Sequence, residues 1–545
     1  YQNISVDPLN AREGVFEVFN KNYFTTLSAY QLRWSLYEDG VEIKNGNLEL
    51  GNVPSRSRKK ITVPYLYNQL KPASEYFVKF QFLLNSDKPW AKKGYVQADE
   101  QYLVKNADHS SSITSVQNAI QKLELTEIGD IKTIKGKNFT AQFDAKVGTI
   151  HSLVYGNETI IAPGNGPKLN AFRAYVNNDN WAVDQWFENG LHNLQHKALS
   201  GTVTKRGDGA IALAFNVKSQ APNAAKLIGG TTGTTNSIQE LTERKFGEND
   251  FKFTTNQIWT VYPDGSIELQ SSIASNKSTL ALARLGYEMK LPQKYSNFTY
   301  YGRGPADNYN DRKTSQFIEL YKGPVKEEYF PIAKPQNVGN HEDVRWCALT
   351  DHANNGAVFI AKGKMSAQAL PYNALDLTLA AHSYQLPKPA DTYLNLDLGV
   401  TGQGGNSCGQ GSPLEQDRVF ASPHNFGFII RPAGNNLTQI AKVSPAGEYP
   451  FSIIRDNTGM VSIATAKADK QIVYELNNNK KEIIYKEPIT LRDGGVITAW
   501  FKNNTSSKVQ AVFGKIGTVA TKVWNVSGVE SGEGNAEHLV DGDPS

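Results

Sequence analysis

The sequence predicts an all-β protein, and three observations lead to this fold class. Asp-Gly pairs stand between strand-like runs, and such pairs favour type I′ hairpin turns because both central residues of that turn need a positive φ. Apolar side chains in the runs recur at every second position, as at Phe139, Ala141 and Phe143. Helical periodicity is confined to 112–125 and 180–196, whereas a barrel of eight β/α units needs a helix about every thirty residues. The Asp-Gly pairs are Asp39-Gly40, Asp208-Gly209 and Asp264-Gly265.

Length and composition restrict the class of protein. The 545 residues correspond to about three to five domains. With 39% hydrophobic and 20% charged residues, the chain can form packed cores. The formal charge of +4 is too small for the concentrated basic surface of a nucleic-acid-binding protein, and no apolar run reaches the roughly 18 residues of a membrane-spanning helix. We therefore expect neither nucleic acid nor a membrane as a partner.

The spacing of strands and polar stretches predicts four parts. Residues 1–105 read as one sandwich of short strands, and a polar linker follows at 107–112. Residues 126–432 form a long β-rich segment with hairpin spacing throughout, and residues 440–515 form a small β unit. Residues 521–545 open another module. Because the chain starts at YQNISVDPLN without Met and stops at LVDGDPS, we expect it to be a piece of a longer protein.

The two cysteines argue against a disulfide framework or a zinc site. They cannot form a disulfide scaffold and no CxxC pair is present, so we expect no metal and no cofactor in this chain. Cys347 alternates within the strand-like run VRWCAL and is predicted to be a small core residue. Cys408 lies in a polar loop without a neighbouring histidine that could act as its base, so we expect it to be non-catalytic.

The glycine-rich run TGQGGNSCGQG at 401–411 is the first candidate binding element. It contains neither GxGxxG nor GxxxxGK[ST], and it follows a strand-like run without opening a helix, so phosphate binding is unsupported. A loop this rich in glycine can bring its backbone close to a ligand. A plain irregular loop is an equally weighted interpretation.

Other candidate residues are better explained by structure than by chemistry. His192 and His196 are four apart in the stretch 180–196, but Asn193 follows His192 where a zinc protease motif has glutamate. Glu158 lies at the tip of a predicted hairpin, where a solvated carboxyl keeps an ordinary pKa and cannot serve as the acid of a retaining glycosidase. The aromatic residues Tyr301, Tyr309, Trp181 and Trp186 could stack on sugars, but most aromatic residues of an all-β protein belong to the core.

Four motifs in the long segment identify a family resemblance. YYGRGPADNYNDRK at 300–313 resembles the GxGPxENYxDR signature of glycoside hydrolase family 2 β-galactosidases. FRAYVNNDNW at 172–181 looks like their RAPxDND stretch. KPQNVGNHEDVRW at 334–346 is similar to PQENGNxTDVRW, with Val338 in place of Glu and His341 in the variable slot. LNLDLGVTGQGGNSCG at 394–409 looks like their penultimate strand and the loop after it.

The resemblance implies a domain layout. Residues 1–105 look like the Ig-like sandwich that follows the catalytic barrel, and 126–432 look like the supersandwich shared with aldose mutarotases. Residues 440–515 are similar to small C-terminal β-sandwich domains of bacterial glycosidases, and 521–545 look like the truncated start of a discoidin-type carbohydrate-binding module. The catalytic glutamates and metal ligands of the family lie in domains that this chain lacks, so the resemblance implies no catalytic residue here.

The resemblance also implies a binding role for the glycine-rich loop, which reaches into the active site in this family. Well-known members place a sugar-stacking Trp where this chain has Cys408. A thiol supplies no aromatic face, so we expect the loop to close the pocket with polar and backbone groups. The substrate-binding residues expected on this basis are Asn406, Ser407, Cys408 and His341.

The function implied is that of a non-catalytic part of a bacterial β-galactosidase, a retaining enzyme that hydrolyses terminal galactosides. This part would complete the rim of the sugar site, and the fragment alone would be inactive. The expected partner is a galactoside or another glycan, a homo-oligomer formed through the whole enzyme is compatible with the resemblance, and a periplasmic or secreted location is expected.

Two alternatives remain open. One is a carbohydrate-binding protein without hydrolytic activity, which would use its sandwiches as lectin-like platforms. The other is an enzyme like aldose 1-epimerase, because that fold is shared. It needs a His acid and a Glu base in one cleft, and the adjacent His341 and Glu342 would point to opposite faces of a strand.

Overall fold

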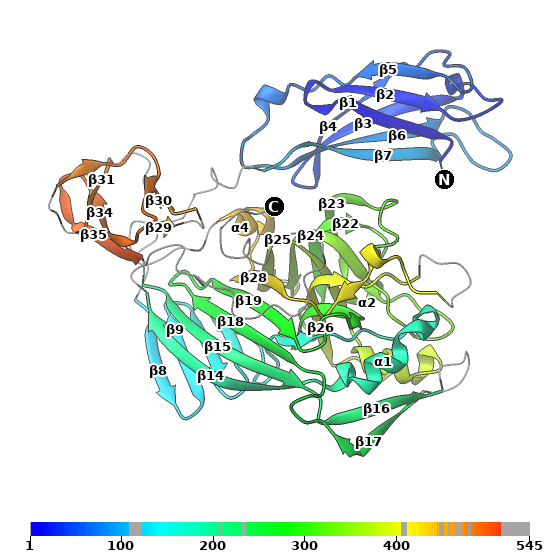
Figure 1. The fold of residues 1–545 in the computed structure, drawn as a ribbon. Coiled ribbons are helices and arrows are strands. Elements are labelled where there is room, and N and C mark those ends of the chain that lie inside the picture. The colour runs from blue at the N-terminus through cyan, green and yellow to red at the C-terminus, as the bar shows by residue number, and fades with distance from the viewer. Residues whose placement is uncertain are drawn as a thin grey trace, which may run out of the picture.

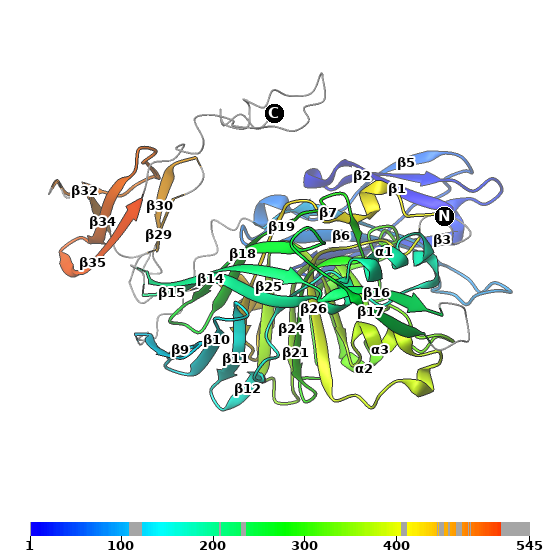
Figure 2. The same cartoon turned by 60° about the horizontal axis from the view of Figure 1, so that its bottom comes forward.

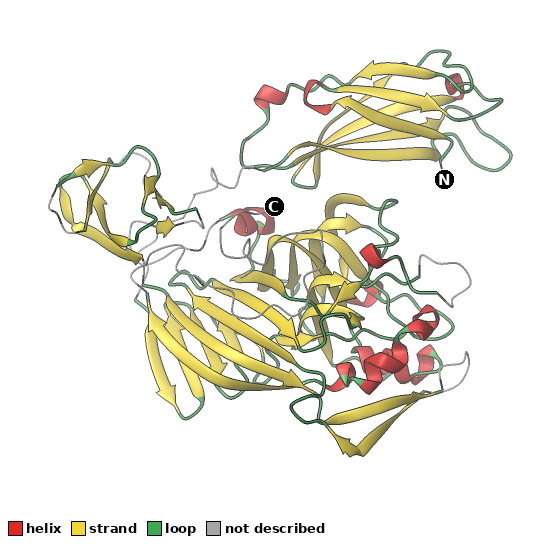
Figure 3. Cartoon of the chain, in the orientation of Figure 1, coloured by secondary structure: helices red, strands yellow, loops and turns green. Residues whose placement is uncertain are grey.

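The computed structural model describes most of the chain and confirms the all-β fold class. The described residues are 2–107, 122–206, 209–229, 236–404, 411–443, 445, 452–455, 458–464, 471–477, 479 and 481–513. Strands dominate this part of the chain, and its helices are short (Figure 3). None of the described helices is long and apolar enough to cross a membrane.

The N-terminal unit is the predicted Ig-like sandwich. A three-stranded sheet, β1-β2-β5, packs against a four-stranded sheet, β4-β3-β6-β7 (Figure 1). Alternate side chains of both sheets meet in one core, where Phe16 of β2 lies 4.8 Å from Phe80 of β6 between ring centroids. The strands are β1 (Ile4–Asn10), β2 (Val15–Asn20), β3 (Tyr30–Glu38), β4 (Val41–Leu48), β5 (Arg58–Thr62), β6 (Tyr76–Leu84) and β7 (Val96–Lys105).

The large unit contains two sheets that enclose one core, which is the predicted supersandwich. The first sheet has the order β12-β11-β10-β9-β8. Its strands are β8 (Glu124–Ile128), β9 (Ile131–Gly136), β10 (Phe139–Asp144), β11 (Thr149–Tyr155) and β12 (Glu158–Ile161). Phe139, Ala141 and Phe143 point into the shared core, as the alternation predicts.

The second sheet of the large unit has twelve antiparallel strands. Nine follow the order β13-β21-β26-β25-β28-β19-β18-β15-β14, and a branch runs from β25 through β24 and β22 to β23. These strands are β13 (Lys168–Asn170), β14 (Gln195–Lys205), β15 (Ile211–Gln220), β18 (Phe253–Val261), β19 (Ile267–Ser275), β21 (Arg284–Pro292), β22 (Asn297–Gly304), β23 (Phe317–Pro324), β24 (Asn340–Thr350), β25 (Gly356–Leu370), β26 (Asp391–Val400) and β28 (His424–Pro432). Two further sheets have two strands each. One pairs β16 (Asn223–Ile228) with β17 (Ser237–Lys245), and the other pairs β20 (Ala281–Leu282) with β27 (Val419–Phe420).

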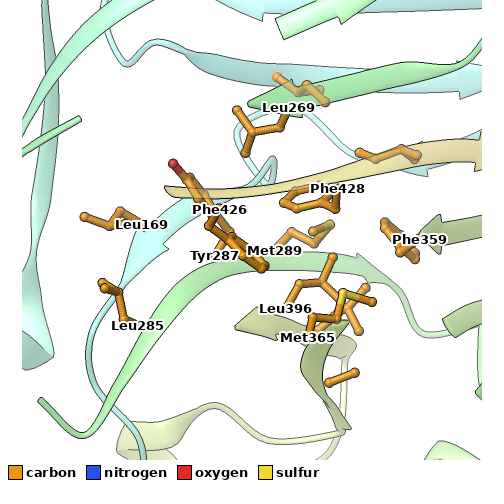
Figure 4. Close-up of a cluster of buried hydrophobic side chains, with 14 of the residues drawn as sticks. Leu169, Leu269, Leu285, Tyr287, Met289, Phe359, Met365, Leu396, Phe426 and Phe428 are labelled. Carbon is orange, nitrogen blue, oxygen red and sulfur yellow. The ribbon is translucent and has the colours of Figure 1, made fainter. Parts of the chain in front are cut away.

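Large apolar side chains from neighbouring strands fill the interior of this unit. Figure 4 shows Tyr287 and Met289 of β21 beside Phe426 and Phe428 of β28. The rings of Tyr287 and Phe426 are stacked with centroids 6.3 Å apart. Cys347 of β24 is fully buried, which confirms the predicted core position, and burial raises the pKa of its thiol.

The helices are α1 (Val183–Glu188), α2 (Val325–Glu328), α3 (Ala374–Leu379) and α4 (Leu437–Lys442). The expected helix over 180–196 is therefore confirmed only in α1, which short 3₁₀ turns flank on both sides. The expected helix over 112–125 is wrong at its end, because Glu124 and Leu125 begin β8, and its first ten residues lie outside the described chain.

The Asp-Gly turns differ among themselves. Asp39 and Gly40 have φ of 49° and 85°, as a type I′ turn requires. At the second pair only Gly209 is described. At the third pair, Gly265 has a positive φ and Asp264 does not. The type I′ expectation is wrong there, because the N–H of Tyr262 donates to the carbonyl oxygen of Ser266 at 2.8 Å, which leaves a three-residue loop, 263–265, rather than a two-residue turn.

The C-terminal unit forms two small sheets, β29-β30-β33 and β32-β31-β34-β35 (Figures 1 and 2). Its core includes Val461, Ile497 and Phe501. The strands are β29 (Ser452–Arg455), β30 (Met460–Ala464), β31 (Ile472–Leu476), β32 (Ile483–Ile484), β33 (Ile489–Thr490), β34 (Gly495–Phe501) and β35 (Asn504–Phe513). The predicted module at 521–545 lies outside the described residues.

The N-terminal sandwich docks on the β22–β23 hairpin of the large unit (Figure 1). The N–H of Leu320 donates to the carbonyl oxygen of Gly40 at 2.9 Å, and the Gln101 amide exchanges two hydrogen bonds with the backbone of Ile318. Glu75 accepts hydrogen bonds from Tyr301 and from both Nε and Nη2 of Arg345. The sandwich therefore contacts both strands of that hairpin.

Candidate functional site

The four sequence motifs converge on the root of the glycine-rich loop, residues 401–404, where β26 ends. The carboxylate of Asp311 accepts hydrogen bonds from the backbone N–H groups of Gln403 at 3.2 Å and Gly404 at 2.9 Å. Asn178 donates to the carbonyl oxygen of Gln403 at 3.0 Å. The Gln403 side chain donates to the carbonyl oxygen of Asn337 at 3.1 Å. We call these residues, Asn178, Asp311, Asn337 and Gln403, the motif junction.

Two glycines make this close approach possible. A Cβ atom on Gly402 would lie 2.5 Å from the carboxyl carbon of Asp311, which is shorter than any ordinary contact. Gly404 has φ of 123°, and a Cβ atom there would lie 2.6 Å from the amide nitrogen of Asn178. Glycine is therefore required at both positions, since any side chain would displace the groups that hold the loop.

A buried ion pair supports the first motif beneath the junction. Arg173 donates to both carboxylate oxygens of Asp179 at 2.7 and 2.9 Å, and neither side chain is more than 1% exposed. The same carboxylate accepts the N–H of Val176, and Arg173 also reaches the carbonyl oxygen of Thr401 at 3.4 Å. Burial raises the pKa of Asp179, and the charge of Arg173 opposes that shift. The pair thus ties the 173–179 segment to the loop root.

The signature stretch 300–313 is held by its own side chains and by the third motif. Asp307 accepts from Arg312 at 3.0 Å and from the N–H of Gly339 at 3.3 Å. Tyr309 is fully buried, and its hydroxyl accepts a hydrogen bond from Asn337 at 2.7 Å. These bonds fix the position from which Asp311 reaches the loop.

A cluster of buried polar side chains lies behind Asn337. Gln368 of β25 donates to the side chain of Asn337 at 3.1 Å and accepts from Arg284 of β21 at 2.8 Å. Arg284 forms an ion pair with Asp397 of β26 at 3.0 Å, and both side chains are at most 1% exposed. Burial raises the pKa of Asp397 to about 7 despite the opposing charge of Arg284, and Glu342 adds a like charge. Ionisation of the buried Asp397 carboxyl therefore reduces the stability of the folded state.

We expect Asp397→Asn to become more stable relative to the wild type as pH rises. The unfolded carboxyl titrates near pH 4 and the folded one at about 7, so the wild type loses stability across that window, whereas the neutral amide does not. Thermal melting of both proteins at about pH 5 and about pH 8 measures this change.

Asp343→Asn is the matched control for this prediction. Burial opposes the charge of Asp343, but the hydrogen bond and charge of Arg303 outweigh it and hold the pKa below its usual range. The stability that this carboxylate contributes is complete at pH 5 and above, so the difference between Asp343→Asn and the wild type should stay constant. The same pH trend in both variants would contradict the assignment to Asp397.

A cleft of about 250 Å³ opens beside the junction. It is lined by Val176 and by four carboxamide side chains, those of Asn177, Asn178, Gln336 and Gln403. Carboxamides both donate and accept hydrogen bonds without carrying charge, which suits a neutral ligand rich in hydroxyl groups. Among the described residues, no group of three or more His, Cys, Asp or Glu side chains is arranged to hold a metal ion.

The predicted site residues are placed only in part. Asn406, Ser407 and Cys408 lie outside the described residues. His341 is fully buried in β24, stacked on Tyr300 with centroids 4.1 Å apart. Its Nδ1 pairs with the carbonyl oxygen of Arg303 at 3.0 Å and its Nε2 with the carboxylate of Glu328 at 2.8 Å. Both ring nitrogens are therefore engaged within the protein. Contact between His341 and a sugar stays a prediction.

The motifs are visible in the sequence, but which of their residues meet is not. Asn178 and Gln403 are separated by 225 positions, and no local pattern shows that they form a hydrogen bond. Arg284, Gln368 and Asp397 were missed entirely, since each alternates within a strand like a core residue. A charged residue at an inward position of a strand is the signal that could have identified Arg284 and Asp397.

The interpretation of the aromatic residues as core is confirmed for three of four. Tyr301, Tyr309 and Trp186 are at most 3% exposed, and Trp181 is half-buried. Glu158 begins β12 directly after the turn that follows β11, where it pairs with Lys294 and accepts from Tyr295. The predicted hairpin is therefore confirmed, but the placement of Glu158 at its tip is wrong, because Glu158 pairs with Tyr155 in the strand ladder and the turn consists of residues 156–157.

Comparisons with known proteins agree with the four motifs. A family model described as the β-galactosidase small chain matches residues 135–430, and one for domain 4 of β-galactosidase matches residues 16–105. A β-galactosidase of Priestia megaterium is 29% identical over 436 residues, which cover 79% of this chain and 39% of the relative. A β-galactosidase of Halalkalibacterium halodurans is 28% identical with the same two coverages.

Solved structures add little beyond these relatives. A putative mutarotase from Salmonella typhimurium is 12% identical and covers 59% of this chain and 96% of its own, but its TM-score of 0.32 is too low to support an argument. The chain spans about two fifths of the length of the curated relatives that it matches. Because the first family model covers more than half of the residues, the chain belongs to the β-galactosidase small-chain family.

Proposed function

We propose that this chain is the non-catalytic part of a β-galactosidase that forms one rim of the sugar site. The observation that carries the proposal is the motif junction, in which three segments far apart in sequence hold the root of one loop. The relatives named β-galactosidase support a galactoside as the substrate of the whole protein. The carboxamide cleft next to the junction supplies neutral hydrogen-bonding groups that suit its hydroxyls.

The carboxyl groups at this site do not support catalysis by the chain itself. A retaining glycosidase needs two carboxyl groups about 5 Å apart that both reach the substrate. Here Asp179 is buried against Arg173, Asp307 is bonded to Arg312, and both oxygens of Asp311 accept backbone N–H groups. Each of these carboxylates is bound to a neighbouring arginine or to backbone N–H groups. We therefore propose that the chain positions the substrate rather than cleaves it.

Hydrolysis of a nitrophenyl β-galactoside by the purified chain and by the whole protein tests this proposal. We expect the chain to fold, as judged by circular dichroism and a cooperative melt, and to show no hydrolysis above buffer. The whole protein should hydrolyse the same substrate. Turnover by the chain that survives repurification, or a whole protein that binds galactosides without hydrolysing them, would contradict it.

A further inference from the structure

A second polar pocket, of about 270 Å³, lies between β13, β21 and the 3₁₀ turn that precedes β14. It shares no lining residue with the carboxamide cleft at the motif junction. Its titratable lining residues are Lys168, His192, His196, Glu288 and Lys290. We call it the histidine pocket. None of these side chains takes part in the motif junction.

The pocket brings together the two histidines that are four positions apart in the sequence. His192 lies in the 3₁₀ turn Leu191–Asn193, and His196 lies at the start of β14, so a bend in the chain rather than a helix makes them neighbours. His192 pairs with Glu240 at 3.2 Å. His196 uses Nδ1 for the hydroxyl of Ser219 at 2.9 Å, and its Nε2 has no hydrogen-bond partner among the described residues.

His196 is neutral at physiological pH. Burial lowers the pKa of His196 to about 4, and the charge of Lys168 adds to this shift. A neutral imidazole whose Nδ1 is bonded to a hydroxyl can donate or accept at Nε2, according to its tautomer. The pocket therefore contains one uncharged group that adapts to either kind of ligand atom.

Lys168 and Glu288 are opposite charges that stand on paired strands without touching. Their Cα atoms are partners in the β13–β21 register. Lys168 donates to the carbonyl oxygen of Gly164 at 2.9 Å, and Glu288 accepts from Asn395 at 3.3 Å. No ion pair joins the two among the described residues. Each therefore retains hydrogen-bonding capacity that the protein leaves unused.

The arrangement of charges selects the ligand chemistry. Lys168 and Lys290 would attract an anion that Glu288 repels, and Glu288 would attract a cation that both lysines repel, so the pocket favours neither sign of charge on all sides. A neutral ligand with several hydroxyls can donate to Glu288, accept from Lys168 and bond to His196 at the same time. The volume is slightly below the roughly 300–1,000 Å³ of sites for drug-sized ligands, which suits a single sugar ring.

We propose that the histidine pocket is a binding site for a neutral monosaccharide. All residues that line the pocket belong to this chain, and binding there does not depend on hydrolysis of a galactoside. It therefore stands or falls independently of the proposed β-galactosidase function.

Ligand-observed saturation-transfer NMR on the purified chain tests the proposal, with the methyl glycosides of galactose, glucose and mannose as probes at millimolar concentration. We expect saturation transfer to at least one glycoside. Glu288→Gln should weaken its binding about tenfold, because one of the two acceptor oxygens becomes an NH₂ donor. Asn193→Trp places a bulky side chain at an exposed position of the pocket rim and should block binding without disturbing the core.

Lys322→Met, an exposed change on β23, is the control and should bind like the wild type. The carboxamide cleft is a competing location for the same probes, so each variant is also measured in a Gln336→Ala background, which alters that cleft alone. Absence of transfer from all three glycosides would overturn the proposal. So would binding that Asn193→Trp leaves unchanged in the Gln336→Ala background, or binding that falls when sulfate is added, which would indicate an anion site.

Discussion

Replacing Asp311 by Asn is expected to release the root of the glycine-rich loop. The two carboxylate oxygens now accept the N–H groups of Gln403 and Gly404, and an asparagine would turn its NH₂ group toward one of them. Hydrogen bonds to a charged group contribute about 1.5–3 kcal/mol each, so hydrogen exchange of these two amides should accelerate about 10²-fold. Exchange measured by NMR or mass spectrometry gives the result directly.

The same variant should lower kcat/KM of the whole protein toward a nitrophenyl galactoside, again by about 10²-fold, if the loop forms part of the sugar site as proposed. Asp417→Asn is the matched control, because among the described residues Asp417 bonds to the loop root through its backbone carbonyl oxygen, which accepts the N–H of Gly402 at 2.8 Å, and not through its side chain. That variant should exchange and react like the wild type. Unchanged exchange at Gly404 in Asp311→Asn would refute the anchoring role. Faster exchange with unchanged kcat/KM would instead refute the proposed part of the loop in the sugar site.

Replacing Arg173 by Met is expected to destabilise the large unit strongly. The change leaves the carboxylate of Asp179 buried without its partner and removes a donor from the carbonyl oxygen of Thr401. Breaking a buried ion pair in this way typically reduces the free energy of unfolding by about 3–5 kcal/mol. Denaturant unfolding followed by circular dichroism or fluorescence measures the loss.

The pH dependence identifies the cause of that loss. The unpaired carboxyl of Asp179 becomes neutral when protonated, and burial already raises its pKa, so the loss should shrink as pH falls toward 4. Arg58→Met is the control, because Arg58 is half-exposed and pairs with Asp7 and Glu17 at the surface. Its loss should be much smaller than that of Arg173→Met, because solvent screens a surface ion pair. Equal losses in the two variants would show that the burial of the pair at Arg173 has no special effect.

The sequence predicts the local features of this protein well because they depend on neighbouring residues. The turn at Asp39-Gly40 and the inward alternation of Phe139, Ala141 and Phe143 follow directly from φ preferences and the two-residue period of a strand. The turn at Asp264-Gly265 does not follow from these preferences, because the register of the flanking strands leaves more than two residues between them. Local propensity cannot anticipate register, which distant strand pairs determine.

The sequence motifs of the candidate site could be predicted, but the hydrogen bonds that join their residues could not. The motif letters single out Asp311, whereas its hydrogen bond to the N–H of Gln403 joins residues 92 positions apart. The histidine pocket is a further case, because the spacing of His192 and His196 suggests a helix face and the structure brings them together through a bend into a strand. In both cases the missing information was how distant segments pack.

The docking of the N-terminal sandwich on β23 also protects the large unit against self-association. β23 pairs only with β22 among the described strands, so its other side is a sheet edge. On that edge, the N–H of Leu320 donates to Gly40, and the N–H and carbonyl oxygen of Ile318 both bond to the side-chain amide of Gln101. Open edges recruit strands from other molecules. A fragment that begins after the sandwich would expose this edge, and we expect it to assemble edge to edge more readily than the whole chain.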